Sequence, residues 1–369
     1  MLELREDGLY FSYDEYINDR DLHAFNDAIY YAWINGGRFG GDATECVEQH
    51  VTNSIYRIRT KLLDYAPMPE GLKARLKPST PEEPMNESLR AGFAKQLLLG
   101  ADPEFVVLED GVPTAVSNII PHAGTVGYDH SGWVLELRPA PQASAWELRQ
   151  HIARLLASTR LKKLEGKKWR AGAYCNGRPP ERPHITLGGH IHFGHLPNMV
   201  EAQDAKTGKY WRSPYLEPKT CIGTLSLLTS RLEELDILPT RECAARRNTG
   251  NYGKLTDYRG GDDGTHHWEY RAMASWLYHP DNTFICLALG KLAVLHPKTV
   301  AAKLQEQAGR AGLTAVLEAF KRDVDAQRAL ETMDLSKLVH DPDREIREAW
   351  RVEIARASKA GGKPMPLPE

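Results

Sequence analysis

The sequence has no apolar run of the roughly 20 residues that a membrane-spanning helix requires. The first residues, MLELREDGLYFSYDEY, are acidic and carry no apolar signal-peptide core. We therefore expect a cytoplasmic protein that is not associated with a membrane.

An excess of charge of either sign is also missing. The chain of 369 residues has 47 Lys+Arg against 49 Asp+Glu, a formal net charge of −2. This balance excludes a general nucleic-acid coat or a polybasic membrane anchor, so we expect no nucleic-acid partner. It leaves room for a local basic site that binds a phosphorylated ligand.

Paired cysteines and phosphate-binding fingerprints are absent as well. The five cysteines are scattered and form no CxxC pair. Neither a disulfide framework nor a thiolate zinc site is indicated, and we expect reduced, mostly buried thiols. No GxxxxGK[ST] or GxGxxG occurs, so the sequence predicts neither a P-loop nor a dinucleotide fold.

The length suggests about two domains, or one large domain with additions. Helical spacing of apolar residues over 21–37 and 45–65 predicts a mainly helical accessory region in 1–66. Prolines punctuate a linker over 67–90. The core is expected over 91–298, followed by a helical C-terminal region over 299–369 with a flexible tail.

The predicted core is rich in strands. Two β-rich runs flank Asp110-Gly111, which is a strong hairpin signal. Ser144 and Glu147 form a capping box that begins a helix reaching about Glu165. Further helices are expected over 219–236, 280–296, 299–332 and 341–358.

Four of the predicted strands carry pairs of ligand-type residues. Residues i and i+2 of a strand point to the same face, and the opposite face is apolar in each case. The pairs are Asp102 with Glu104, Glu136 with Arg138, His190 with His192, and Glu269 with Arg271.

Buried charges are costly unless they are paired or bound to a metal. If the four strands are neighbours, their polar faces form one concave site suited to divalent cations and phosphates. Each pair also has a simpler explanation: a local ion pair on a solvated face, or histidines that serve packing. The argument rests on the four pairs together.

A glycine-rich basic segment, RRNTGNYGKLTDYRGGDDG, lies between the third and fourth pairs. Such a loop is suited to wrapping a phosphate with backbone N–H groups and cations. The alternative is a solvated surface loop without function. Its basic residues are Arg246, Arg247, Lys254 and Arg259.

The ordered motifs GADPEF, ELRPAP, GGHIHFG, YGKLTDYR and WEYR resemble those of phage-type COOH–NH2 ligases, or amidoligases. These are distant relatives of glutamate–cysteine ligase and glutamine synthetase. The resemblance covers about residues 95–290. It implies an α+β fold, with a curved and mainly antiparallel sheet whose concave face is the active site and whose flanks are helices. It also implies ATP and Mg²⁺ or Mn²⁺, and an amide formed through an acyl phosphate.

The resemblance also implies roles for individual residues. Asp102 is either a further metal ligand or the orienter of one. Arg138 and Arg271 would face phosphate or a substrate carboxylate, and Lys254, Arg259, Arg246 and Arg271 would contact ATP. Catalysis would rest on Arg138, Lys254, Arg259 and Arg271. The implied metal ligands are Glu104, Glu136, His190, His192 and Glu269.

Two other functions remain open at this point. His-x-His on a strand with nearby carboxylates also describes metal-dependent hydrolases. The fold would equally suit a structural or assembly protein, for instance of a phage, that no longer catalyses. As a ligase, the chain would join a carboxylate and an amine from an amino acid, peptide or protein side chain, in the host cytoplasm if a phage encodes it. A protein partner would bind the N-terminal or C-terminal helical region.

Overall fold

The chain divides into two compact units, Met1–Pro84 and Met85–Glu369. The computed structural model describes residues 85–129, 132–175, 184–250, 252–261, 265–341 and 344–359, together with the backbone of short strands between residues 2 and 64. The predicted helix over 21–37, most of the predicted linker and the tail after 359 lie outside the described residues.

The described elements of the first unit are strands, not helices. β1 pairs with β2, β6 lies between β3 and β5, and β4 pairs with β7. The helix expected over 45–65 is therefore wrong where β5, β6 and β7 lie. The segment VTNSIYRI is rich in β-branched and aromatic residues, which favour strands once a partner is present. The strands are Leu2–Arg5, Gly8–Phe11, Tyr16–Ile17, Arg38–Gly40, Val47–Glu48, Tyr56–Ile58 and Lys61–Asp64.

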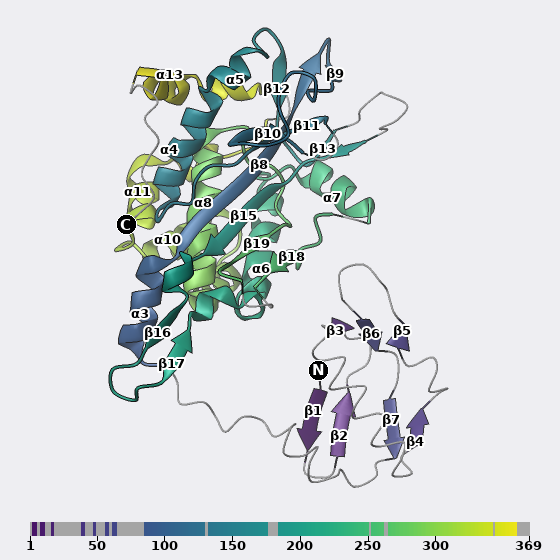
Figure 1. Cartoon of the computed structure of the whole chain (residues 1–369), viewed down its shortest axis with the longest axis vertical. Coiled ribbons are helices and arrows are strands. Elements are labelled where there is room, and N and C mark those ends of the chain that lie inside the picture. Colours follow the sequence, from purple (N-terminus) through teal and green to yellow (C-terminus); the bar gives the residue numbers. More distant parts are fainter. Residues whose placement is uncertain are drawn as a thin grey trace. The chain divides into compact units, whose positions relative to one another are not determined.

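The second unit is built on an antiparallel sheet of eight strands, with path order β10-β11-β8-β15-β19-β18 and with β9 and β12 also paired to β8 (Figure 1). This mixed α+β architecture confirms the predicted fold class. The strands are β8 (Leu98–Glu109), β9 (Val112–Pro113), β10 (Val126–Tyr128), β11 (Val134–Leu137), β12 (Lys168–Arg170), β15 (Gly189–Gly194), β18 (Tyr258–Gly260) and β19 (His267–Tyr270).

The hairpin between β8 and β9 confirms the turn predicted at Asp110-Gly111. Both residues have positive φ, at 51° and 79°. Two-residue hairpin turns of this kind match the right-handed twist of the strands, and Asp-Gly is a favoured pair for them. Two smaller hairpins are β13 (Tyr174–Cys175) with β14 (Ile185–Thr186), and β16 (Glu201–Gln203) with β17 (Tyr210–Arg212).

Helices pack on the apolar face of the sheet. α8 contacts β15, and α4 contacts β8. Ile191, Phe193, Trp268 and Tyr270 are fully buried there. The helices are α3 (Glu87–Gln96), α4 (Ala145–Leu156), α5 (Thr159–Lys162), α6 (Ile222–Glu234), α7 (Thr240–Asn248), α8 (Pro280–Leu295), α9 (Pro297–Glu306), α10 (Gly309–Ala319), α11 (Val324–Thr332), α12 (Ile346–Ala349) and α13 (Arg351–Lys359).

Single turns of 3₁₀-helix are η2 (Pro197–Met199), η3 (Pro214–Leu216), η4 (Pro218–Thr220) and η5 (Leu335–Lys337). α3 begins at Glu87, so the predicted linker over 67–90 extends too far into the second unit. The Asn86 side chain caps this helix by accepting from Leu89 N at 2.8 Å. The capping box predicted at α4 is present, because Ser144 Oγ accepts from Glu147 N at 3.2 Å.

The C-terminal helices belong to the core of the second unit. Asp325, at the start of α11 and only 1% exposed, accepts hydrogen bonds from Ala145 N at 2.8 Å and Trp146 N at 3.1 Å. A buried carboxylate thus satisfies free N–H groups at the start of α4. Trp350, fully buried, donates to the carbonyl of Leu277 at 2.6 Å. Residues 299–359 are therefore an integral layer rather than an appendage.

No single helix in the described part of the chain is long and apolar enough to cross a bilayer. α8 and α9 reach that length and composition only as a pair, and they are bent by 118° to each other.

Candidate active site

The four predicted polar pairs lie on four adjacent strands, in the order β11, β8, β15 and β19. Antiparallel register places Glu136 opposite Glu104, His190 opposite Asp102, and His192 opposite Glu269. Directly opposed residues share a face of the sheet. The prediction that these strands bring their polar faces together is confirmed, and both histidines lie on the same face as the glutamates.

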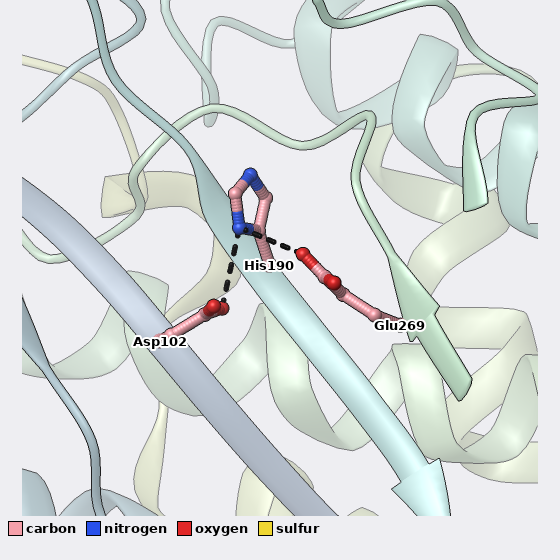
Figure 2. A group of neighbouring side chains, drawn as sticks. All are labelled: Asp102, His190 and Glu269. Carbon is pink, nitrogen blue, oxygen red and sulfur yellow. Dashed lines mark ion pairs between the residues drawn. The ribbon is translucent and has the colours of Figure 1, made fainter. Parts of the chain in front are cut away.

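The tightest group on this face consists of Asp102, His190 and Glu269 (Figure 2). His190 Nδ1 lies 3.3 Å from Asp102 Oδ1 and 3.1 Å from Glu269 Oε1. His192 Nε2 lies 3.3 Å from the same Asp102 oxygen. One ligand atom from each of the three residues falls within 4.8 Å of the other two. This spacing suits a single cation with three protein ligands.

The electrostatics of this group follow from burial and charge. Burial alone would lower the pKa of His190, but the charges of Asp102, Glu104 and Glu269 raise it to about 9. Burial opposes the charged form of Asp102 as well, yet His190 and His192 hold its pKa well below the usual range. A proton on His190 thus balances buried carboxylates, and a divalent cation would take the place of that proton.

The surroundings of the buried carboxylate oxygens also fit a metal. Asp102 Oδ1 and Glu269 Oε1 make ion-pair contacts of 3.1–3.4 Å, but neither accepts a well-aligned hydrogen bond from the described residues. Buried carboxylate oxygens without such bonds are costly, and a hard cation removes that cost. The predicted ligands His190 and Glu269 are joined here by Asp102, whose role the sequence left open.

Glu104 and Glu136 lie opposite each other on β8 and β11, two residues along β8 from Asp102. Glu104 accepts a hydrogen bond from Gly188 N, and burial raises its pKa to about 7. Burial, followed by the charge of Asp102, raises the pKa of Glu136, whereas its ion pair with Arg138 lowers it. Their assignment as metal ligands, like that of His192, remains a prediction.

Two of the predicted arginines surround Glu269. Arg259 Nη2 lies 2.6 Å from Glu269 Oε2, and Arg271 Nε lies 3.4 Å from Oε1. The Arg259 side chain is 68% exposed, so its guanidinium can reach a ligand on this face. Lys254 is exposed in the segment before β18. The phosphate contacts expected of these residues remain predictions.

The basic segment is not one continuous loop. Arg246 and Arg247 lie in the last turn of α7, and Arg259 lies on β18. Arg247 forms a two-point ion pair with Glu233 at 2.8 and 2.6 Å. The prediction of one loop is wrong at both ends, because the basic residues there belong to the helix α7 and to the edge strand β18.

Arg246, on α7, is buried next to His190. It is 3% exposed and donates to the carbonyls of Ala272 at 3.0 Å, Met273 at 2.9 Å and Arg271 at 3.2 Å. Its Nη2 lies 3.5 Å from His190 Nε2. This geometry makes it a support for His190 and for the end of β19, rather than an open phosphate contact.

A cavity of about 390 Å³ opens beside Asp102. His195, His266 and His267 line it, and sequence reasoning missed all three. His267 could have been found, because it lies two residues before Glu269 on the same strand and therefore shares its face. His195 lies beyond β15, where strand periodicity gives no signal.

A sequence model of the family described as phage phiEco32-like COOH.NH2 ligase-type 2 matches residues 99–204 and 234–352, more than half of the chain. The chain belongs to this family. The matched ranges include all four polar pairs, α7 and β18. The resemblance inferred from the motifs is confirmed.

Solved structures similar to this family member share little of its sequence. A bifunctional glutathione synthetase from Pasteurella multocida has a TM-score of 0.38 and 12% identity over 74% of this chain and 51% of its own. The chain thus spans about half the length of that enzyme. A glutamine synthase homolog has a TM-score of 0.32 and 15% identity, covering 74% and 70%.

GmaS, solved without ligand, has a TM-score of 0.29 and 13% identity, covering 86% of this chain and 74% of its own. Among curated proteins, no sequence matches that of the chain.

Proposed function

We propose that this chain is an ATP-dependent carboxylate–amine ligase that forms an amide through an acyl phosphate. The observation that carries the proposal is the group of Asp102, His190 and Glu269, with Arg259 and Arg271 placed on the same glutamate. Carboxylates and an imidazole suit Mg²⁺ or Mn²⁺, and arginines suit phosphate oxygens.

In this proposal Asp102, His190 and Glu269 hold the divalent cation. When bound, the cation supplies positive charge to the oxygens of the transferring phosphoryl group. Arg259 and Arg271 bind those oxygens from the β18–β19 side, and exposed Lys254 contacts the same phosphates. Phosphoryl transfer needs positioning and positive charge far more than covalent help from the protein.

The chemistry balances in two steps. A carboxylate oxygen of the acid attacks the γ-phosphorus of ATP, and the bond from that phosphorus to the ADP oxygen breaks. The amine nitrogen then attacks the acyl carbon, the carbon–oxygen bond to phosphate breaks, and the nitrogen loses a proton. The products are an amide, ADP and inorganic phosphate. Glu269 keeps Arg259 and Arg271 oriented throughout, because it contacts both.

The test is incubation of the full chain with MgATP and pools of amino acids and peptides. ADP release should appear together with a product whose mass is that of an acid plus an amine less one water. Cleavage of a pool member without ATP would favour a hydrolase instead. If ATP is neither bound nor consumed with any pool, the proposal is wrong.

A further inference from the structure

We infer that the cavity beside Asp102 is the subsite for the amine substrate, and that it takes an ammonium carried on an apolar or aromatic group. The inference rests on the proposed ligase function and names the substrate class of that site. At about 390 Å³, the cavity has the size of a small-molecule pocket.

The walls of the cavity are largely apolar. Pro139 and Pro141 follow β11, and Leu196 and Pro197 follow β15. Gly100 also lines the cavity and lies opposite His192, where a Cβ would come within 3.1 Å of the histidine's own Cβ. A substrate with an aliphatic or aromatic group would bury apolar surface against these walls.

The fixed charges that face the cavity favour a cation. Besides four histidines, its described lining includes two carboxylates, Asp102 and Glu136, and one fixed cation, Arg138. Arg138 is already held by Glu136 and by the carbonyls of His122 at 3.0 Å and Gly124 at 3.2 Å. Asp102 Oδ1 is buried, with His190 Nδ1 and His192 Nε2 each at 3.3 Å. The two carboxylates outweigh the one fixed cation, so the lining favours an ammonium over a carboxylate or a phosphate.

The cations that suit phosphate lie elsewhere on the same face. Arg259 and Arg271 contact Glu269 on the β18–β19 side and do not line the cavity. Asp102 belongs both to the cavity lining and to the group of Figure 2. An amine in the cavity would therefore meet the acyl phosphate next to Asp102, with the nucleotide on the other side.

The test compares three probes of one shape and different charge: phenethylamine, hydrocinnamate and phenethyl alcohol. Each is titrated calorimetrically into the full chain at neutral pH without ATP. We expect the amine to bind at least about tenfold more tightly than the acid, a preference that close pairing with a carboxylate readily supplies. Equal binding of amine and acid, or no binding of the amine, would overturn the inference.

Two variants locate the binding. Leu196→Trp should fill part of the cavity and weaken phenethylamine at least about tenfold, the equivalent of roughly 1.4 kcal/mol. Val112→Trp, at an exposed position on β9 outside the cavity, is the matched control and should bind as the parent does. Unchanged binding in Leu196→Trp would place the amine elsewhere and end the assignment.

Two further variants test charge in opposite directions. Glu136→Gln removes a carboxylate and releases Arg138, so the preference for amine over acid should fall. Arg138→Gln removes the cation and should raise that preference. Because these titrations need no ATP, they test amine binding in the cavity separately from ligation. Ligation in which Leu196→Trp leaves the KM for the amine unchanged would overturn the cavity assignment alone.

Discussion

Asp102 and His190 face each other across β8 and β15, with 3.3 Å between Oδ1 and Nδ1. The pairing is set by the register of two neighbouring antiparallel strands rather than by a flexible loop. Glu269 on β19 completes the group from the other side of His190. Three rigid strands therefore hold the ligand atoms in place, as a preorganised metal or phosphate site requires.

Glu269→Gln should weaken Mn²⁺ binding at least about tenfold, because it removes one of three proposed ligands. Electron paramagnetic resonance of free Mn²⁺ measures this directly. Glu233→Gln is the matched control: Glu233 is also buried and paired with an arginine, Arg247, but it lies outside the site. Parent-like Mn²⁺ affinity in Glu269→Gln would rule out the metal assignment.

Metal binding should release a proton. The pKa of His190 is raised to about 9, so at neutral pH this imidazole is protonated and must lose its proton to become a ligand. Mn²⁺ affinity should therefore rise as the pH rises toward about 9. Calorimetry in two buffers of different ionisation enthalpy counts the protons. An affinity that does not vary over this pH range would show that His190 is not a ligand.

Arg259→Ala and Lys254→Ala should lower ATP turnover by roughly 10²–10³, the loss expected when one contact to transition-state charge is removed. Thermal stability should change less than turnover for Arg259, because its side chain is 68% exposed and the buried Glu269 keeps His190 and Arg271 as partners. Arg247→Ala, which breaks only the Glu233 pair, is the control and should keep its turnover. Near-normal turnover in both site variants would show that these two residues belong to a solvated surface and have no role in phosphate binding.

Arg246→Ala should destabilise the fold. It leaves the buried carbonyls of Arg271 and Ala272 without this donor, at a cost of about 2 kcal/mol or more. Arg246→Lys should restore only part of the loss, because an ammonium cannot reproduce the fork of a guanidinium. Thermal melting of the Arg246 variants checks this, with Arg241→Ala, at an exposed position on the same helix, as the control. If Arg246→Ala melts with the parent, the support role is wrong.

A truncated chain that begins at Met85 should fold and keep its Mn²⁺ affinity, because Met85–Glu369 is one compact unit. A chain that begins at Glu87 should be less stable by about 0.5–2 kcal/mol, since it lacks the Asn86 cap of α3. Asn86 also donates to Asp204 at 2.6 Å. Loss of folding in the chain that begins at Met85 would show that residues 1–84 are an integral layer of the structure.

The strands and their polar faces were predictable because period-two alternation is local. Glu136, His190 and Glu269 could each be assigned to a face from their immediate neighbours, and the register then aligned them. Arg246 could not be assigned in this way. It reaches His190 from a helix, and only tertiary structure shows that its fork is taken up by backbone carbonyls.

Long-range pairing also explains the failure in the first unit. Residues 45–65 have apolar spacing that suits either a helix or short strands, and the choice depends on strand partners distant in sequence. β6 pairs with β3 as well as with β5, and β7 pairs with β4. The role of Asp102 stayed open for the same reason, since its partners come from two other strands.

Trapping with hydroxylamine tests the central claim most directly, because it needs no knowledge of the natural amine. The full chain is incubated with MgATP, a pool of carboxylic acids and hydroxylamine, which converts an acyl phosphate into a stable hydroxamate. The account predicts ADP and a hydroxamate in equal amounts, both dependent on Mg²⁺ and both lost in Glu269→Gln. ADP release without hydroxamate, or hydroxamate formed equally well by Glu269→Gln, would contradict it.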